Sequence, residues 1–154
     1  MRKKALRKGF SLLEILIVVA IIAILTGAAV PYLGAMRQES RIARAKGELR
    51  ALQSAVESFY VHHNNTYPSN AQFPGGLETA TPNIIGGDAP QDPFNTGNEY
   101  GYDRGGTSEQ YYVIYSVGTN STGSAEINDA SNTVSEVDGN SCIYVSNAGR
   151  DPVP

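Results

Sequence analysis

An apolar run of 21 residues, 10–30, follows a strongly basic start and is the feature that most constrains the fold. Five of the first eight residues are Arg or Lys. As a helix the run would be about 31 Å long, which matches the ~30 Å hydrocarbon core of a bilayer. The basic start predicts that the N-terminus stays in the cytoplasm and that the rest of the chain is exported. We therefore expect one helix that crosses a membrane.

A cleaved secretory signal peptide is the competing interpretation of this run. Its cleavage site would be the small residues 27–29, Gly-Ala-Ala. The run is longer than the ~7–15 apolar residues of a signal peptide. A helical pattern also continues past Pro31 and would lose its anchor if the chain were cut there. Both observations favour a retained membrane helix.

Glu14 places a carboxylate five positions into the apolar run. A carboxylate at the bilayer centre costs several kcal/mol, although one near a helix end can reach the interface. Alternatively, cleavage after Gly9 would make Phe10 the N-terminus and supply an ammonium. Between neighbouring subunits offset along their axes, one Phe10 amine can meet the next Glu14. Such a buried charge pair is tolerable only when both partners are present.

Residues 8–14, KGFSLLE, with the unbroken apolar stretch after them, resemble the class III signal of type IV pilins and type II secretion pseudopilins. The resemblance implies that a prepilin peptidase cuts after Gly9 and methylates Phe10. It implies that Glu14 is the assembly carboxylate. It further implies a single-pass protein of the bacterial inner membrane that becomes a periplasmic or cell-surface filament.

The same resemblance implies the partners of this chain. They are other copies of itself, the prepilin peptidase, and minor pilins or pseudopilins. An inner-membrane assembly platform with a separate ATPase would draw the subunits out of the bilayer. The chain itself has no Walker loop, and it lacks the Gly-x-Ser-x-Gly, Cys-x-x-Cys and His-Glu-x-x-His motifs. We therefore expect a structural protein and not an enzyme.

Apolar residues after the membrane run recur with the spacing of one helix face: Ile42, Ala45, Leu49, Leu52, Val56 and Phe59. Together the two segments predict one helix from Phe10 to near Tyr60, with its second half packed on its own domain. Pro31 cannot donate to the carbonyl of Gly27, and Gly27 and Gly34 lower helix propensity. We predict a kink or local melting between Gly27 and Gly34.

The composition changes to Gly, Pro, Asn, Ser and Thr from residue 64 onward. Strands are expected at 99–102, 111–117 and 142–145, with a short helical turn near 77–79. The fold class is therefore α+β: a long N-terminal helix, transmembrane and then amphipathic, with a small antiparallel sheet packed on its second half (the pilin fold). The expected regions are a cleaved leader at 1–9, a membrane or filament-core helix at 10–30, an amphipathic stalk at 31–63 and a β-rich head at 64–154.

The head resembles the C-terminal domain of the major pseudopilin of type II secretion at DPFN (92–95), YGY (100–102) and YSVG (115–118). That resemblance implies calcium in the following loop, where Asn120 stands in place of the family's first Asp. The candidate ligands are Asn120, Glu126 and Asp129, because hard cations take carboxylate and amide oxygens. A plain polar loop is the alternative. The one cysteine, Cys142, forms no intrachain disulfide, which favours the pseudopilin branch and fits a small buried side chain.

Charge is unevenly spread along the chain. The net charge is −3, and removing the five leader cations takes it to −8. From residue 61 onward eleven acids face two cations, Arg104 and Arg150, so nucleic acid is not an expected partner. The favoured function is a filament subunit of a type II secretion pseudopilus that drives protein export. The alternatives are a type IV pilin for adhesion, motility or DNA uptake, a membrane-anchored binding module that does not polymerise, and a secreted soluble domain.

Overall fold

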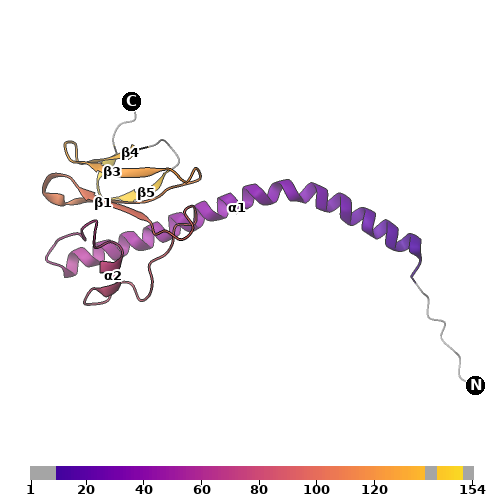
Figure 1. Ribbon diagram of the computed structural model, residues 1–154, viewed down its shortest axis with the longest axis horizontal. Helices are drawn as coiled ribbons and strands as arrows, with labels where there is room; N and C mark the ends of the chain where they lie inside the picture. Colours follow the sequence, from indigo (N-terminus) through magenta and orange to yellow (C-terminus); the bar gives the residue numbers. More distant parts are fainter. Residues whose placement is uncertain (1–9, 138–141, 151–154) are drawn as a thin grey trace, which may run out of the picture. The chain divides into compact units, whose positions relative to one another are not determined.

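The computed structural model describes residues 10–137 and 142–150 and confirms the α+β class (Figure 1). One long helix is followed by short strands that pack on its second half. The chain divides into two compact units that meet between Arg37 and Gln38, and the long helix runs through both. In chain order the elements are α1 (Leu12–His62), α2 (Gly75–Thr79), β1 (Gly101–Gly105), the 3₁₀ helix η1 (Thr107–Glu109), β2 (Tyr111–Ser116), β3 (Ser124–Asn128), β4 (Thr133–Val137), β5 (Ile143–Ser146) and β6 (Gly149–Arg150).

Helix α1 ends at His62, and two consecutive asparagines follow in the turn after it. Asn64 and Asn65 have positive φ angles of 55° and 56°, a conformation that Asn adopts more easily than most residues. The backbone N–H of Asn65 donates to the carbonyl of Tyr60 at 3.1 Å and so satisfies one carbonyl of the last turn. The ring of His63 stacks on that of Phe59, with the centroids 3.8 Å apart. These contacts turn the chain back toward its own helix.

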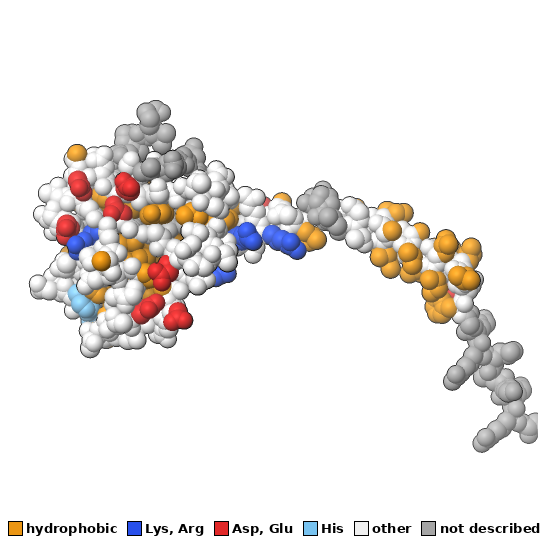
Figure 2. Space-filling view, viewed as in Figure 1, with side chains coloured by type: hydrophobic (Ala, Val, Ile, Leu, Met, Phe, Trp, Pro, Cys, Tyr) orange, Lys and Arg blue, Asp and Glu red, His pale blue; other side chains and the backbone are white. Residues whose placement is uncertain are grey.

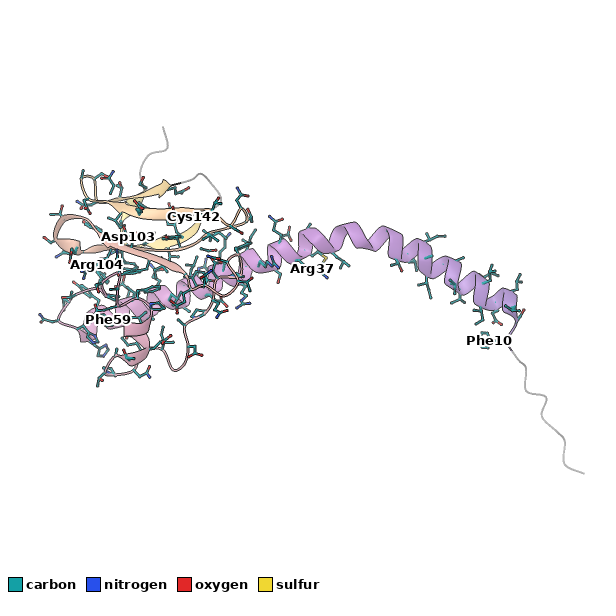
Figure 3. All side chains as sticks on the ribbon, viewed as in Figure 1. Phe10, Arg37, Phe59, Asp103, Arg104 and Cys142 are labelled. Atoms are coloured by element: carbon teal, nitrogen blue, oxygen red, sulfur yellow. The ribbon has the colours of Figure 1, made fainter. Side chains whose placement is uncertain are left out.

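The second half of α1 carries the larger of two hydrophobic cores. Its buried face is the one that the spacing predicts, and Phe59 lies near its end (Figure 3). The head covers this face with side chains from the loop after α1, from α2 and from β2. The buried residues of this core are Ala45, Leu49, Leu52, Ala55, Val56 and Phe59 on α1, and Tyr67, Leu77, Tyr100, Tyr112 and Ile114 in the head.

Strand β2 lies at the centre of the first sheet, between β1 and β5, and pairs antiparallel with both. Alternate side chains of a strand point to opposite faces. Tyr112 and Ile114 therefore join the core on α1, while Val113 joins a second core with residues of β3 and β4. Because β2 is covered on both faces, its sequence is an almost continuous apolar run.

A second sheet, β3-β4-β6, was not expected from the sequence. Strands β3 and β4 pair antiparallel, and β6 adds a short parallel pairing to β4. In β3 only Ala125 and Ile127 are buried, and Glu126 between them is exposed. Among residues 133–136 of β4, whose burial is described, only Val134 is fully buried. Strands this short, with polar residues on the open face, carry little periodic signal, which explains the omission.

The α1 core predicts a large effect of truncating Leu49, which is fully buried. Leu49→Ala should lower the free energy of unfolding by about 2–5 kcal/mol, because it removes packed methyl groups and leaves a cavity. Urea unfolding of the full-length protein in detergent measures the change. Val61→Ala is the control, because Val61 is 70% exposed on the same helix and its loss should cost within about 0.5 kcal/mol. Equal losses in the two variants would contradict the assigned core.

Candidate assembly site

The start of α1 holds the residues for which processing and assembly roles were predicted. Ser11 precedes the first turn, and its Oγ accepts a hydrogen bond from the N–H of Leu13 at 3.3 Å. Its carbonyl accepts from the N–H of Glu14 at 3.0 Å. Ser followed three residues later by Glu is a pattern of helix starts, and a carboxylate in the first turn suits the positive end of the helix. This local role of Glu14 was not among the roles predicted from the sequence.

The Glu14 side chain is exposed, and within the described residues its carboxylate has no hydrogen bond or ion pair. Phe10, four residues earlier, is 75% exposed at the start of α1 (Figure 3). Gly9, the predicted cleavage site, lies outside the described residues. The roles of Gly9, Phe10 and Glu14 therefore stay predictions, and the single chain leaves the Glu14 carboxylate available to a partner.

Apolar side chains lie uncovered along the first part of α1, and Figure 2 shows them on one face. The large ones from Phe10 to Leu25 are each between 45% and 89% exposed. A helix that is apolar on every side belongs in lipid or among other helices. Within the described residues, no single unbroken helix is long and apolar enough to cross a membrane. One bent pair of helical segments, Leu12–Ala28 and Leu33–His62, meets the length and hydropathy criteria when the two are taken together. Whether Gly27, Pro31 and Gly34 cause a functional kink stays a prediction.

Two carboxylates on the second half of α1 fasten the head through tyrosine hydroxyls. The hydroxyl of Tyr112 donates to Glu57 at 2.6 Å, and that of Tyr67 donates to the same carboxylate at 3.2 Å. Nine residues before Glu57 on the same helix, Glu48 accepts a hydrogen bond from the hydroxyl of Tyr100 at 2.6 Å. The contacts join residues up to 55 positions apart and fix the rotation of α1 under the first sheet.

These tyrosines keep their protons well above neutral pH. Burial, followed by the neighbouring Glu57, raises the pKa of Tyr67 to about 12. Burial and the hydrogen bond to Glu48 raise the pKa of Tyr100, and burial and the bond to Glu57 raise that of Tyr112. Each hydroxyl therefore remains a donor to its carboxylate under physiological conditions.

Asp92 is a fully buried carboxylate that ties the loop before β1 to the end of β2. Its Oδ1 accepts from the Ser116 hydroxyl at 2.8 Å and from the N–H of Phe94 at 2.9 Å. Its Oδ2 accepts from the N–H of Val117 at 2.9 Å. A buried carboxylate is stable only with such partners. The DPFN motif therefore has a structural reason for its Asp.

The predicted calcium ligands lie on β3 and on the two loops at its opposite ends. Asn120 follows β2, Glu126 is exposed on β3, and Asp129 lies in the turn between β3 and β4. The Oδ1 of Asp129 accepts from the N–H of Gly106 at 2.6 Å. Among the described residues, no group of three or more His, Cys, Asp or Glu side chains is placed to hold a metal ion. Calcium at Asn120, Glu126 and Asp129 stays a prediction.

Cys142 is half-buried against the second core. Burial raises the pKa of its thiol to about 12, so the thiol is neutral at physiological pH and a poor nucleophile.

Two family models match consecutive parts of the chain, which together make up most of it. Residues 4–30 match the prokaryotic N-terminal methylation motif, and residues 33–136 match the model of type II secretion system (T2SS), protein G. The second match runs from the stalk through β1, β2 and β3 into β4, and ends before β5 and β6. The chain belongs to the type II secretion protein G family. It is thus a major pseudopilin, a structural protein and not an enzyme, which confirms the prediction from the sequence.

Relatives of known identity agree with this assignment. The type II secretion system core protein G of Pseudomonas aeruginosa is 31% identical over 137 residues, which cover 80% of this chain and 92% of that protein. The core protein G of Pectobacterium carotovorum is 32% identical over 100 residues, 58% of this chain and 64% of the relative. A fimbrial protein of Pseudomonas aeruginosa is 34% identical over 79 residues, 49% of this pseudopilin and 51% of that protein. No solved structure gives a significant match.

The methylation motif and the apolar start of α1 together indicate that this pseudopilin is anchored in the inner membrane. Its family further implies that its partners belong to the secretion system.

The raised tyrosine pKa values predict a loss of stability in alkali. An unfolded Tyr67 releases its proton near pH 10, whereas the folded one holds it to about pH 12. The unfolded state therefore binds fewer protons in this interval, and the free energy of unfolding falls as the pH rises through it. Thermal unfolding followed by circular dichroism from pH 9 to 12 measures the fall. In Tyr67→Phe the fall should be shallower, and a curve parallel to the wild type would contradict the assignment.

The Asp92 contacts predict that Asp92→Asn destabilises the head by about 1–3 kcal/mol. An amide has one acceptor oxygen, whereas the carboxylate has two. In the variant, either the N–H of Val117 loses its acceptor, or the Ser116 hydroxyl and the N–H of Phe94 lose theirs, in a buried site. Urea unfolding measures the cost. Asp88→Asn serves for comparison, because Asp88 is exposed and its side chain has no hydrogen bond to a described residue. Comparable stability losses in both variants would rule out this role of Asp92.

Proposed function

We propose that this pseudopilin is inserted in the inner membrane with its N-terminus in the cytoplasm, is cut after Gly9, and packs with copies of itself into a helical filament. The filament grows from the membrane and drives protein export. The observation that carries the proposal is the start of α1: apolar on all sides, exposed, and bearing one carboxylate without a partner among the described residues.

Membrane insertion and filament formation both cover the same apolar surface. In the bilayer, lipid surrounds residues 10–30, and in the filament the helices of neighbouring copies replace the lipid. The apolar surface therefore makes either state more favourable than exposure to water. Transfer between the two states leaves the hydrophobic term nearly unchanged, so polar contacts decide which arrangement of helices forms.

Glu14 is the polar group that sets this arrangement. After cleavage, the ammonium of Phe10 and the carboxylate of Glu14 are the charges nearest to the start of the apolar helix. Pairing the amine of one copy with Glu14 of the next offsets two helices along their axes by about one turn. An unpaired Glu14 in the filament core costs several kcal/mol, so wrong registers are rejected.

The other partners follow from the chemistry that this chain lacks. It has no nucleotide-binding loop, so energy for extraction comes from a separate ATPase at an inner-membrane platform. A prepilin peptidase provides the cut and the methyl group on Phe10. Minor pseudopilins complete the filament. The low helix propensity of Gly27, Pro31 and Gly34 lets helices adjust to their neighbours.

A type IV pilus is the second candidate assembly. The fimbrial relatives support it, including the type IV major fimbrial protein FimA of Dichelobacter nodosus, which is 40% identical over 55 residues. Those 55 residues are 36% of this chain, whereas the protein G model extends to residue 136. The head therefore favours the pseudopilus.

The Glu14 role predicts that Glu14→Val abolishes filaments but leaves insertion and processing intact. The variant loses the charge that pairs with the neighbouring amine and gains an apolar side chain, so the membrane anchor is strengthened. Electron microscopy of sheared material measures filaments, and N-terminal sequencing of the membrane-bound protein should show Phe10 first. Glu39→Val is the matched control, because Glu39 is also exposed on α1.

Normal filaments from Glu14→Val would contradict the pairing role. A mature protein that starts at Met1 would overturn the cleavage, and one that starts near Val30 would show a secreted domain. A protein that starts at Phe10 but stays single in the membrane would favour an anchored binding module.

A further inference from the structure

Positive and negative charge lie on different parts of this molecule. Beyond the leader, five of the seven cations fall between residues 37 and 50 on α1, whereas eleven of the fifteen acids follow residue 61. Figure 2 shows Lys and Arg side chains gathered where α1 enters the head, and Asp and Glu side chains over the head. We refer to residues 37–50 as the basic segment. Identical subunits with acidic heads repel one another, unless each head meets the basic segment of a neighbour.

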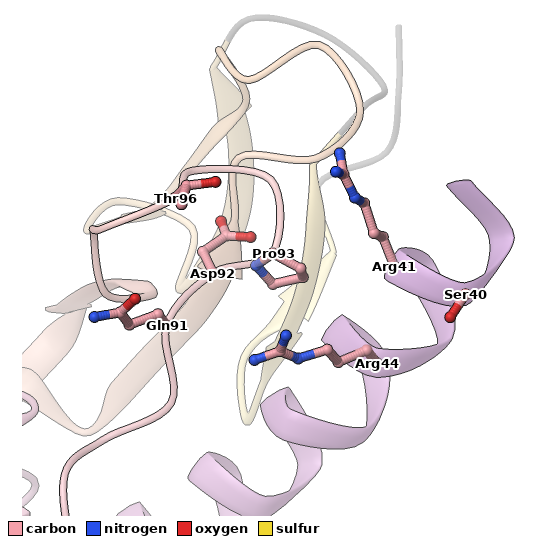
Figure 4. Close-up of a pocket in the computed structure, with 7 residues that line it drawn as sticks. All are labelled: Ser40, Arg41, Arg44, Gln91, Asp92, Pro93 and Thr96. Atoms are coloured by element: carbon pink, nitrogen blue, oxygen red, sulfur yellow. The ribbon is translucent and has the colours of Figure 1, made fainter. Parts of the chain in front are cut away.

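The basic segment borders a cleft in the second unit of the chain. The cleft lies between α1 and the loop that carries the DPFN motif, and its volume is about 360 Å³ (Figure 4). Arg41 and Arg44 border it from the helix side, and Thr96 adds a hydroxyl from the loop. The space can hold one acidic side chain with its first water molecules.

The charges around the cleft leave one guanidinium available. Arg44 is paired with Glu48 at 2.7 Å. Asp92 also lines the cleft, but it is 2% exposed and both of its oxygens accept hydrogen bonds from the head itself. Arg41 is exposed and has no ion pair with any described residue. A planar guanidinium beside an open cleft is suited to bidentate binding of a carboxylate.

We propose that the cleft bordered by Arg41 receives an acidic side chain from the head of a second copy. This contact rests on the proposed filament and adds a second, water-exposed contact to the one between Phe10 and Glu14. It provides the opposite charge that the crowded acidic heads require.

Three carboxylates of the described part of the head remain as candidates for the incoming group. The other acids of the described head are already engaged: Glu78 with a backbone N–H, Asp92 and Asp103 with two chain segments each, Glu109 with Arg104, Asp129 with Gly106, and Glu136 with a further group. The carboxylates that are exposed and without a hydrogen bond or ion pair to a described residue are Asp88, Glu99 and Glu126.

An anionic lipid headgroup is a less suitable occupant. Arg41 lies eleven residues beyond Val30, so it stands about 16 Å further along a helix. The headgroup region extends only about 5–8 Å beyond the hydrocarbon core. Arg37 is within closer reach of lipid phosphates, whereas Arg41 faces the head loop. The observations therefore favour a second copy.

The test is a charge reversal with a matched control and a second-site rescue. Full-length Arg41→Glu is produced with the assembly components, and sheared filament is quantified relative to processed protein in the cells. We expect about a tenfold loss, because a like charge replaces an attractive pair at an interface. Arg50→Glu changes the net charge equally but lies nine residues on, half a turn around the helix, and should keep its filaments.

Rescue identifies the incoming acid. Asp88→Lys, Glu99→Lys or Glu126→Lys, each combined with Arg41→Glu, should restore filaments in one of the three cases. Arg41→Gln removes the charge with little change in size. Filaments of this variant should dissociate with a weaker dependence on salt concentration than wild-type filaments. Thermal unfolding of each variant separates lost contacts from lost folding.

Several outcomes would overturn the contact. They are wild-type yields from Arg41→Glu, an equal loss from Arg50→Glu, or no restoration by any of the three lysines. Normal filaments combined with weaker binding of Arg41→Glu to phosphatidylglycerol vesicles would assign the cleft to lipid instead. A wild-type protein that forms no filaments overturns the proposed function itself, whereas equal filaments from wild type and Arg41→Glu overturn this contact only.

Discussion

One long helix has to satisfy two different environments, and the rest of the molecule follows from that constraint. From Phe10 to Ala28 every described side chain of α1 is exposed, and nearly all are apolar. From Ala45 to Phe59 the same helix buries one face under the head and leaves charged residues on the other. The first segment is stable only in lipid or among helices of other copies, so the folded single chain is incomplete in water.

The head is built to stay fixed on this helix while the first segment changes its surroundings. Apolar packing supplies most of the stability, and the hydroxyls of Tyr100 and Tyr112 add directional bonds to Glu48 and Glu57. Directional bonds define rotation about the helix axis, which apolar contact alone leaves loose. A head held in one rotation presents the same surface in every copy, as a helical filament requires.

Residues that look similar in the sequence serve different physical purposes here. Glu14, Glu48 and Asp92 are all carboxylates. Asp92 is satisfied by its own loop and by β2, and Glu48 by a head tyrosine and Arg44. Glu14 alone of these three has no side-chain partner among the described residues. The acids with partners, Glu48 and Asp92, stabilise the fold, whereas Glu14 is the acid proposed to act in assembly.

The sequence by itself determined the long helix, its buried face, the strand at 111–116 and the family, because apolar spacing and a dense local motif are properties of neighbouring residues. Only the tertiary structure showed the second sheet, the tyrosine contacts with Glu48 and Glu57, and the cleft beside Arg41. These depend on residues brought together from up to 55 positions apart, and the polar side chains involved leave no periodic pattern in the chain. Long-range pairing, and not local preference, decided them.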